Sequence, residues 1–515
     1  MTSVTPETSP EAAARVSHPV VNAALIVPFI LFAVAFLAAT QVVQMNEDAA
    51  ILFRYSANLA ETGVISYNPG GVPVEGATDF LFMVVIGGLA ALGLDPYAGA
   101  ILLNIAAFGA ILALLDRLFR LDMLTALGVV AAFVAMAPFS AAAAGFSVIV
   151  FLAAILACIT FAHERALLPF ALSALICCLI RPDGFVFAAP LTLLVVAQHL
   201  REPRAYATLI AALVIPGIAY FLWRWSYFGE FLPLPFYVKA EVERDIFGLF
   251  YSGSIPFFLQ MAVPLLIGLT AALIGARDGR RPILTVLAVA LVPAFCFYLA
   301  MHLIQNLGNR FLAFIPLIAV VAIANVALPW LRVAMLAVLA LSMVPDARSH
   351  MGYLAQETND HHIAAGIGTL EAPIEMAVTE AGHLAYHSGA QVLDLWGLNS
   401  PEFARMPATG EDMLGREFDL IALHFPGIYD CAAMAGAHQA LWSGPVWQRS
   451  DATMRDWGLM VQGVLSGIDP SDYALFEVPI FVPADSRHFM YLVHTDRPQA
   501  EAIVGLLEAN NARAC

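Results

Sequence analysis

The chain has 515 residues, of which 60% are hydrophobic and 12% charged, and its formal net charge is −16. A soluble globular protein has about 25% charged residues, so this composition excludes an ordinary soluble protein. The acidity is concentrated in residues 346–515, which contain 22 Asp and Glu against 8 Arg. A strongly acidic segment argues against nucleic acid as a partner.

Long apolar runs recur between residues 22 and 345 and predict a polytopic α-helical membrane protein with about 11–12 transmembrane helices. The predicted spans are 22–42, 97–116, 121–139, 141–162, 166–180, 184–199, 206–224, 256–276, 282–303, 310–327 and 328–345. Residues 79–93 are also apolar, but a crossing needs about 20 residues. We therefore expect this shorter stretch to lie in, or dip into, the membrane.

The short basic clusters predict the orientation of the chain. They are Arg117/Arg120, His163/Arg165, Arg201/Arg204 and Arg277/Arg280/Arg281. Basic loops remain in the cytoplasm, and placing all four there puts the N-terminus inside and the C-terminal segment outside.

Residues 346–515 differ from the rest of the chain, because short strand-like runs alternate there with turn residues. The expected strands cover 374–378, 391–395, 419–424 and 489–493. This pattern predicts a soluble α/β or α+β domain of about 170 residues, an ordinary domain size. Cys431 and Cys515 both fall in this segment and are either paired or two free thiols.

Two adjacent acids, Glu47 and Asp48, follow the first span at the expected edge of the membrane. We expect residues 46–78 to form an outer loop with a juxtamembrane helix over 48–62. Adjacent residues of a helix do not share a face, so one carboxylate can enter a cleft as a general base for an acceptor hydroxyl. The structural alternative is that Asn46 or Asp48 caps the helix.

Further polar groups follow within the same loop. Arg54 can bind a phosphate through parallel hydrogen bonds, or it can extend its charge to the membrane interface. Tyr55 lies roughly on the helix face of Asp48. Residues 67–71 have the composition of a turn, which we expect to fold Glu75 and Asp79 back toward Asp48. Ordinary loop polarity explains these two acids equally well.

Isolated cations recur in other segments predicted to face outward. Arg181 either pairs with Asp183 or faces an anionic lipid head group. Lys239, the only lysine of the chain, follows an aromatic and proline-rich stretch, and a compact ammonium suits a phosphate oxygen. Arg310 stands at the entry to a later span. Cations outside oppose the usual charge distribution, so we interpret them as an anion site.

The order of these motifs resembles that of the GT-C superfamily of integral-membrane glycosyltransferases. The closer similarity is to a bacterial group related to the mycobacterial terminal arabinofuranosyltransferases, and it covers about residues 40–400. The motifs are Glu47-Asp48-Ala49, Arg54-Tyr55, Asn58-Leu59, Asn68-Pro69-Gly70, Val74-Glu75-Gly76-Ala77-Thr78, Arg181-Pro182-Asp183-Gly184, Tyr227-Phe228-Gly229-Glu230, Phe236-Tyr237-Val238-Lys239-Ala240, Arg310-Phe311, Tyr386-His387-Ser388-Gly389 and Asp394-Leu395-Trp396-Gly397-Leu398-Asn399.

This resemblance implies a GT-C fold and an enzyme that moves a sugar from a polyprenyl-phosphate donor to a cell-envelope glycan or lipid, with inversion of the anomeric centre. The similar group suggests a pentofuranose as the sugar. The implied location is the bacterial inner (cytoplasmic) membrane, with residues 346–515 in the periplasm and membrane lipids as further partners. No cofactor is implied, and a divalent metal stays open.

The resemblance also suggests roles for single residues. Asp48 would be the catalytic base, with Glu47 as the second choice. The expected phosphate-binding residues are Arg54, Arg181, Lys239 and Arg310. The expected sugar-binding or acceptor-binding residues are Tyr55, Asn68, Glu75, Asp79 and Tyr237.

The sequence departs from the family pattern at several positions, since Glu47 and Glu230 each stand in place of Asp and Leu234-Pro235 stands in place of Asn-Thr. Asp79 stands where Asn or Ser is usual, and Ser147 stands where the family often has Glu. Ser147 therefore supports one alternative, a non-catalytic envelope-glycan binding protein with a degraded GT-C fold. The other alternative is a transporter or flippase of lipid-linked sugars. It predicts polar residues deep within several spans, and the sequence has few.

Overall fold

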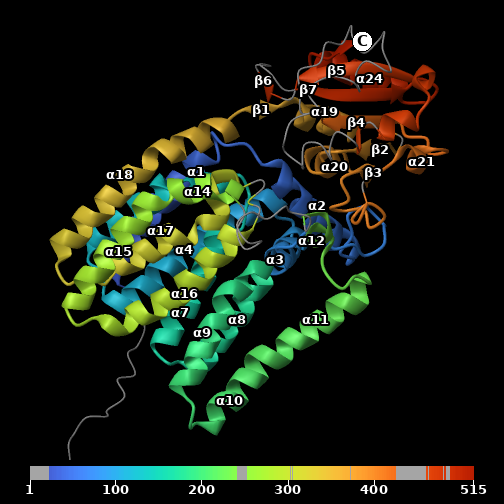
Figure 1. The fold of residues 1–515 in the computed structure, drawn as a ribbon. Coiled ribbons are helices and arrows are strands. Elements are labelled where there is room, and N and C mark those ends of the chain that lie inside the picture. Colours follow the sequence, from blue (N-terminus) through green and yellow to red (C-terminus); the bar gives the residue numbers. More distant parts are fainter. Residues whose placement is uncertain are drawn as a thin grey trace, which may run out of the picture.

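The computed structural model describes residues 22–239, 252–301, 303, 306–371, 373–406, 408–424, 460–461, 463–479, 481–482 and 488–514. A helical module is followed by a smaller domain built on a sheet (Figure 1). Cys431 and Cys515 lie outside the described residues, so both alternatives, a disulfide and two free thiols, stand.

The first part of the chain is a bundle of apolar helices. Its helices are α1 (Ile26–Ala39), α2 (Glu47–Thr62), α3 (Phe80–Ala91), α4 (Pro96–Phe119), α5 (Met123–Ala135), α6 (Ala137–Ala143), α7 (Val148–His163), α8 (Leu167–Ile180), α9 (Phe185–Gln198), α10 (Pro203–Leu209), α11 (Ile215–Phe228), α12 (Leu234–Lys239), α14 (Ile255–Gln260), α15 (Ala262–Arg277), α16 (Arg281–Ala300), α17 (Phe314–Ala324) and α18 (Pro329–Leu354).

Five helical segments among the described residues are long and apolar enough to cross a membrane. The pair α5 and α6, bent by 73°, passes the same test when taken together, and shorter apolar helices of 10–17 residues accompany them. This architecture confirms the predicted polytopic helical fold. The number of crossings and the orientation of the chain stay predictions.

Helix α3 is the stretch whose path the sequence left open. Its 12 residues measure about 18 Å, less than the hydrocarbon core of about 30 Å. It packs along α2, where the Ser56 hydroxyl donates to the Met83 carbonyl at 3.0 Å. Gly87 permits this approach, because a Cβ there would lie 3.0 Å from Leu59. Helix α3 therefore packs along α2, and its length is that of a helix that lies within or beside the membrane without crossing it.

Two other helices differ from the expected spans. Residues Pro203–Phe228 run through α10, a π-helical turn (Ile210–Val214) and α11, and they stand out from the bundle (Figure 1). Helix α18 continues through Pro345 to Leu354, so the expected domain boundary at residue 345 falls inside a helix. The apolar run ends before the helix does, because the last turns of α18 are polar.

The C-terminal domain has a mixed six-stranded sheet in the order β3-β2-β4-β7-β5-β8. Strands β2 (Glu375–Val378), β3 (Gln391–Asp394) and β4 (Leu420–His424) are parallel, with Val378 opposite Asp394 and Ala422. Strands β7 (His488–His494), β5 (Tyr473–Pro479) and β8 (Arg513–Ala514) continue the sheet antiparallel. Strands β1 (Glu357–Thr358) and β6 (Phe481–Val482) form a separate pair. The expected strands thus correspond to β2, β3, β4 and β7.

Alternation along the strands places side chains on both faces of this sheet. Met376 and Val378 face a core with α19 (Asn359–Ile367), α20 (His383–Ser388) and α24 (Ala500–Ala509), whereas Ala377 faces a second core. Ile51 and Tyr55 of α2 belong to the first of these cores. Helix α2 therefore joins the membrane module to the C-terminal domain through shared apolar packing.

Candidate active site

The first turn of α2 holds both adjacent acids. The Asn46 side chain accepts a hydrogen bond from the Asp48 amide at 3.0 Å, so the expected N-cap is present. Upstream, the Asn46 amide donates to Ala144 O at 3.0 Å, and the Gln44 amide donates to Leu354 O at 2.7 Å. The positive end of the helix dipole favours acids at this point. Asn46 caps the helix, so the cap is compatible with a catalytic role for Asp48.

Asp48 lines a cavity of about 150 Å³ that also contains Asp79, Ser147, Arg181 and Arg310. We call it the arginine cavity. Asp48 Oδ2 accepts a hydrogen bond from Arg310 Nη2 at 2.9 Å. The structure therefore brings together four of the predicted site residues from four separate parts of the chain.

Only one of the three guanidinium nitrogens of Arg310 donates a hydrogen bond to a described residue. Its guanidinium carbon lies 3.9 Å from the centroid of the Phe146 ring, and its Nε and Nη1 groups are buried without a hydrogen-bond partner among the described residues. It belongs to a tight turn, Leu307–Leu312, in which Gly308 has a φ of 61°. A Cβ at Gly308 would lie 2.8 Å from Ala137 O, so the close packing that positions Arg310 requires glycine.

Arg181 is held from several sides. Its Nε and Nη2 donate to the Asp183 carboxylate at 2.9 and 2.7 Å, and Asp183 also accepts a hydrogen bond from Tyr298. The guanidinium lies 5.1 Å from the ring centroids of Phe151 and Phe311. The local ion pair expected from the sequence is therefore present. It coexists with the position of Arg181 in the wall of the arginine cavity.

Asp79 and Ser147, two of the departures from the family pattern, contact each other. The Ser147 hydroxyl donates to the Asp79 carboxylate. Burial raises the pKa of Asp79 above its usual range, while the nearby Arg181 and the Ser147 hydroxyl oppose this rise. The turn thus brings Asp79 into the same cavity as Asp48, as the sequence predicts, but Glu75, which was expected there too, does not line this cavity.

Glu47 turns away from the arginine cavity toward the C-terminal domain. Its carboxylate accepts hydrogen bonds from the amides of Gly382 and His383, the latter at 2.8 Å. Gly382 is required at this contact, because a Cβ there would meet the Glu47 backbone. Burial raises the pKa of Glu47 well above its usual range, the negative charges of Asp360 and Glu380 raise it further, and the two amides oppose them.

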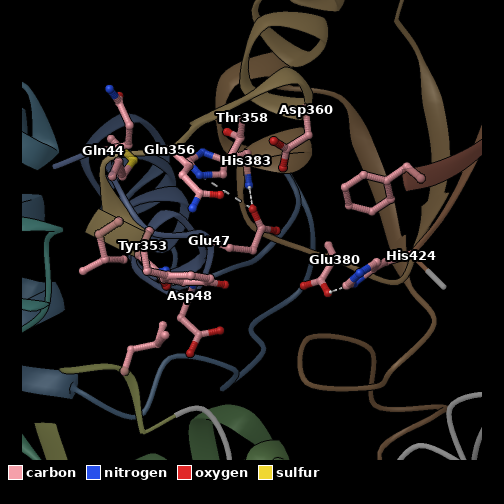
Figure 2. A pocket seen from close by; sticks show the side chains of 15 residues that line it. Gln44, Glu47, Asp48, Tyr353, Gln356, Thr358, Asp360, Glu380, His383 and His424 are labelled. Atoms are coloured by element: carbon pink, nitrogen blue, oxygen red, sulfur yellow. Dashed lines mark hydrogen bonds and ion pairs between the residues drawn. The ribbon is translucent and has the colours of Figure 1, made fainter. Parts of the chain in front are cut away.

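Glu47 lines a second cavity of about 330 Å³ (Figure 2). We call it the acidic cavity, because its walls carry Glu47, Asp48, Asp360 and Glu380. It lies between the start of α2, the end of α18 and the C-terminal domain.

Three predicted ligand-binding residues lie elsewhere, in the contact between α2 and the C-terminal domain. Arg54 donates to the carbonyls of Tyr67, Ala385 and Ala390 and to Asn68. Asn68 in turn pairs with the backbone of Val392 at 2.9 Å in both directions. Neither of them lines the arginine cavity, and their binding roles stay predictions.

Tyr55, the third of these residues, belongs to the same contact. Its hydroxyl donates to Asn399 Oδ1 at 3.1 Å and accepts from the Gly76 amide at 3.0 Å. A Cβ at Gly76 would overlap Asn399 Oδ1. This close approach explains the glycine after Glu75.

Glu75 forms a buried ion pair with Arg224 of α11, with Nε hydrogen bonds of 3.0 and 2.8 Å. Arg224 Nη1 also donates to Phe231 O at 2.7 Å. The pair thus anchors the segment that leads to α12. Arg224 was not predicted from the sequence, although an arginine within the apolar run 215–228 is the signal that could have identified it.

Two predicted residues belong to α12 itself. The Tyr237 hydroxyl accepts from the Leu232 amide at 3.1 Å, and the Arg405 guanidinium lies 4.1 Å from the centroid of its ring. Lys239 ends α12, and its side chain lies outside what the structure describes. Both residues remain predicted ligand-binding groups.

The acidic cavity holds residues that sequence reasoning missed: Asp360, Glu380, His383 and His424. They come from three separate parts of the sequence, with Glu380 and His383 in one of them, and form no recognised motif. Within the described ranges, no group of three or more His, Cys, Asp or Glu side chains is arranged to hold a metal ion.

The comparisons with known proteins bear on the fold. A family model described as a domain of unknown function (DUF8728) matches residues 353–466. No curated protein matches the chain. Among solved structures, the chain is similar to ArnT from Cupriavidus metallidurans in the apo state, with a TM-score of 0.55, and to the same protein bound to undecaprenyl phosphate, with a TM-score of 0.56.

Each of these likenesses has 13% sequence identity and covers 90% of this chain and 97% of the ArnT chain. At this identity the similarity establishes a shared fold alone. The chain therefore shares the fold of ArnT over nearly its whole length.

Proposed function

We propose that this chain, which shares the fold of ArnT, is an inverting glycosyltransferase that uses a polyprenyl-phosphate-linked sugar. The acceptor is a cell-envelope glycan or lipid at the outer face of the bacterial inner membrane, and the C-terminal domain faces the periplasm. A pentofuranose is the sugar that the sequence resemblance favours. The solved ArnT complex with undecaprenyl phosphate supports a lipid-phosphate ligand for this fold.

The observation that carries the proposal is the unsatisfied guanidinium of Arg310 beside Asp48. Its buried Nε and Nη1 groups have no partner within the described part of the chain, and a buried donor without a partner is costly. Arg181 lines the same small cavity. Two guanidiniums with an open position between apolar walls suit a phosphate oxygen.

The reaction follows from this arrangement. Asp48 accepts the proton of an acceptor hydroxyl, and the oxygen forms a bond to the anomeric carbon of the donor sugar. The bond between that carbon and the phosphate oxygen breaks, and its electron pair leaves with the lipid phosphate. Arg181 and Arg310 stabilise the departing charge. A single displacement of this kind inverts the anomeric centre.

The geometry favours Asp48 over Glu47 as the base. Both Glu47 oxygens accept backbone amides, whereas Asp48 faces the two arginines of the cavity. Glu47 is then the residue that holds the C-terminal domain against the start of α2.

The contact between Ser147 and Asp79 argues against a degraded enzyme. The family pattern often has Glu at the position of Ser147 and Asn or Ser at the position of Asp79. In this chain the acid is at position 79 instead. The two side chains touch, so one carboxylate is kept at this wall of the cavity. The exchange therefore leaves the number of acidic residues at this wall unchanged.

The proposal is tested by transfer from a labelled polyprenyl-phosphate sugar in membranes containing the full chain. Asp48→Asn should lower the rate by about 10²–10⁴-fold, the usual contribution of a general base, whereas Glu47→Gln should retain more activity. Asp412→Asn, at an exposed helix cap, is the control. Full activity in both Asp48→Asn and Glu47→Gln would overturn the assignment. Movement of intact donor lipid without loss of its sugar would indicate a transporter.

A further inference from the structure

The acidic cavity is larger than the arginine cavity, about 330 Å³ against about 150 Å³. It reaches the lower end of the size range of small-molecule binding pockets. Part of its wall comes from Tyr353, Thr358, Asp360, Glu380 and His424, all within the segment matched by the DUF8728 family model. The proposed transfer reaction, as derived above, uses none of these residues.

Asp48 is the one described residue that lines both cavities. A donor phosphate at Arg181 and Arg310 would lie in one of these cavities, and the acidic cavity is a separate space that also reaches Asp48.

Buried polar groups without partners indicate that the acidic cavity binds a ligand. Asp360 is 4% exposed and His383 is 2% exposed, yet Asp360 Oδ1 and His383 Nδ1 have no hydrogen-bond partner within the described ranges. Figure 2 shows both side chains close to Glu47 at the wall of the cavity. Such groups in a native structure require an explanation, and a hydroxylated ligand would satisfy them.

The charge of the walls restricts the ligand. No arginine or lysine lines the acidic cavity among the described residues, while four carboxylates do. The histidine near Glu380 is already engaged, because His424 Nδ1 lies 2.8 Å from the Glu380 carboxylate. Carboxylates accept hydrogen bonds from hydroxyl groups and repel phosphate and carboxylate groups.

We propose that the acidic cavity binds the acceptor as an uncharged saccharide end and presents one of its hydroxyls to Asp48. This inference rests on the proposed transfer reaction and adds to it the substrate class of the acceptor. The C-terminal domain is then the part of the chain that selects the acceptor, and the membrane module is the part that binds the donor.

Photo-crosslinking in cells tests this inference with whichever acceptor the cell itself supplies. The reagent p-azidophenylalanine in place of Tyr353 keeps a ring of similar size at the wall of the acidic cavity. After irradiation, mass spectrometry should find a saccharide without phosphate attached at this position. The same reagent in place of Tyr473, which lines neither cavity, is the control and should give no adduct.

A second crosslinking position separates the two hypotheses. The reagent in place of Phe146, in the arginine cavity, should capture a polyprenyl phosphate. A donor adduct at 146 with a phosphorylated glycan, or no glycan, at 353 would reject the acceptor inference and keep the proposed function. A saccharide at 353 without any lipid phosphate at 146 would reject the proposed donor.

Kinetics with the captured saccharide provide an independent measurement. Asp360→Asn and Glu380→Gln should each raise the acceptor KM by about tenfold without changing the donor KM. Glu402→Gln, in an exposed ion pair with Arg416, is the matched control. Equal changes in both KM values would indicate a general structural defect and would overturn the selective role of these acids.

Discussion

At the scale of single residues, the buried arginines differ in how many of their guanidinium nitrogens already have hydrogen-bond partners within the protein. Arg54 and Arg224 donate from all three guanidinium nitrogens to carbonyls, an amide oxygen or a carboxylate. Arg310 donates only through Nη2 among the described contacts. The first two therefore hold the structure together, and the third is available to a ligand.

Replacing Arg310 measures this availability directly. Arg310→Gln should weaken the binding of undecaprenyl phosphate by about 100-fold, because hydrogen bonds to charged groups contribute about 1.5–3 kcal/mol. Binding is measured by titrating the detergent-solubilised protein and following tryptophan fluorescence. Arg416→Gln on the C-terminal domain is the control, and equal affinity in the two variants would show that Arg310 does not bind the phosphate.

The sequence identified Asp48, Asp79, Arg181 and Arg310, which the structure places in one cavity. The sequence could not distinguish the ligand-binding role proposed for Arg310 from the structural role of Arg54. An arginine near a membrane surface has the same sequence pattern whether its partners are carbonyls or a ligand. The partners of Arg54 include Ala385 and Ala390, more than 300 residues away. Only tertiary structure brings them to the helix.

At the scale of secondary-structure elements, α11 illustrates how one buried ion pair positions a segment. Helix α11 has few neighbours in the bundle (Figure 1), and Arg224 joins it to Glu75 in the outer loop. The Leu234 amide also donates to the Glu75 carbonyl at 3.1 Å. Glu75 is therefore central to the path of the chain between α11 and α12.

Removing one partner of this pair should be more harmful than removing both. Arg224→Met leaves the Glu75 carboxylate buried and unpaired, which should destabilise this contact by about 3–5 kcal/mol. The double variant with Glu75→Leu should recover much of the loss. Thermal unfolding is followed by tryptophan fluorescence, since Trp223 and Trp225 flank Arg224.

Arg405→Met breaks the exposed pair with Glu230 and should have little effect in the same experiment. If the double variant were less stable than Arg224→Met alone, the pair would not be the anchor described here.

Helices and strands were largely predictable, because hydrophobic periodicity and turn residues are local signals. The expected helix over 48–62 is α2, and the four expected strands are all present. Strand β5 was missed, since its burial depends on pairing with β7. The end of α18 was not predicted, because the helix continues beyond the apolar residues from which it was predicted.

At the scale of the whole molecule, a chain of polar contacts crosses from the membrane module to the C-terminal domain. Gly76 donates to Tyr55, Tyr55 donates to Asn399, and the Asn399 side chain donates to Asp394 at 2.9 Å. Asp394 is fully buried. The stability of this junction therefore depends on the protonation of one carboxyl group.

Burial raises the pKa of Asp394 to about 6, although hydrogen bonds from Asn399 and neighbouring amides oppose the rise. In the unfolded chain the pKa is about 3.9. As the pH rises from about 4 to about 6, the unfolded state loses its proton first, so the contribution of this group to stability is present below pH 4 and is lost toward pH 6. The loss is about 2–3 kcal/mol.

Asp394→Asn should flatten this decline, whatever its effect on the absolute stability. The measurement compares thermal unfolding of both proteins at intervals between pH 4 and pH 7. Asp412→Asn is the control, because the hydrogen bonds of Thr409 lower the pKa of Asp412, so its contribution is instead lost as the pH falls. An unchanged slope in Asp394→Asn would contradict the assignment.

The order in which the chain is synthesised adds a consequence of the ion pair between Asp48 and Arg310. Asp48 leaves the ribosome 262 residues before Arg310, and the amides that hold Glu47 follow it after more than 330 residues. Every early intermediate of membrane insertion therefore carries the acid without its partners. The arginine cavity therefore cannot be completed before Arg310 is made, and Glu47 is not held until the C-terminal domain has been synthesised.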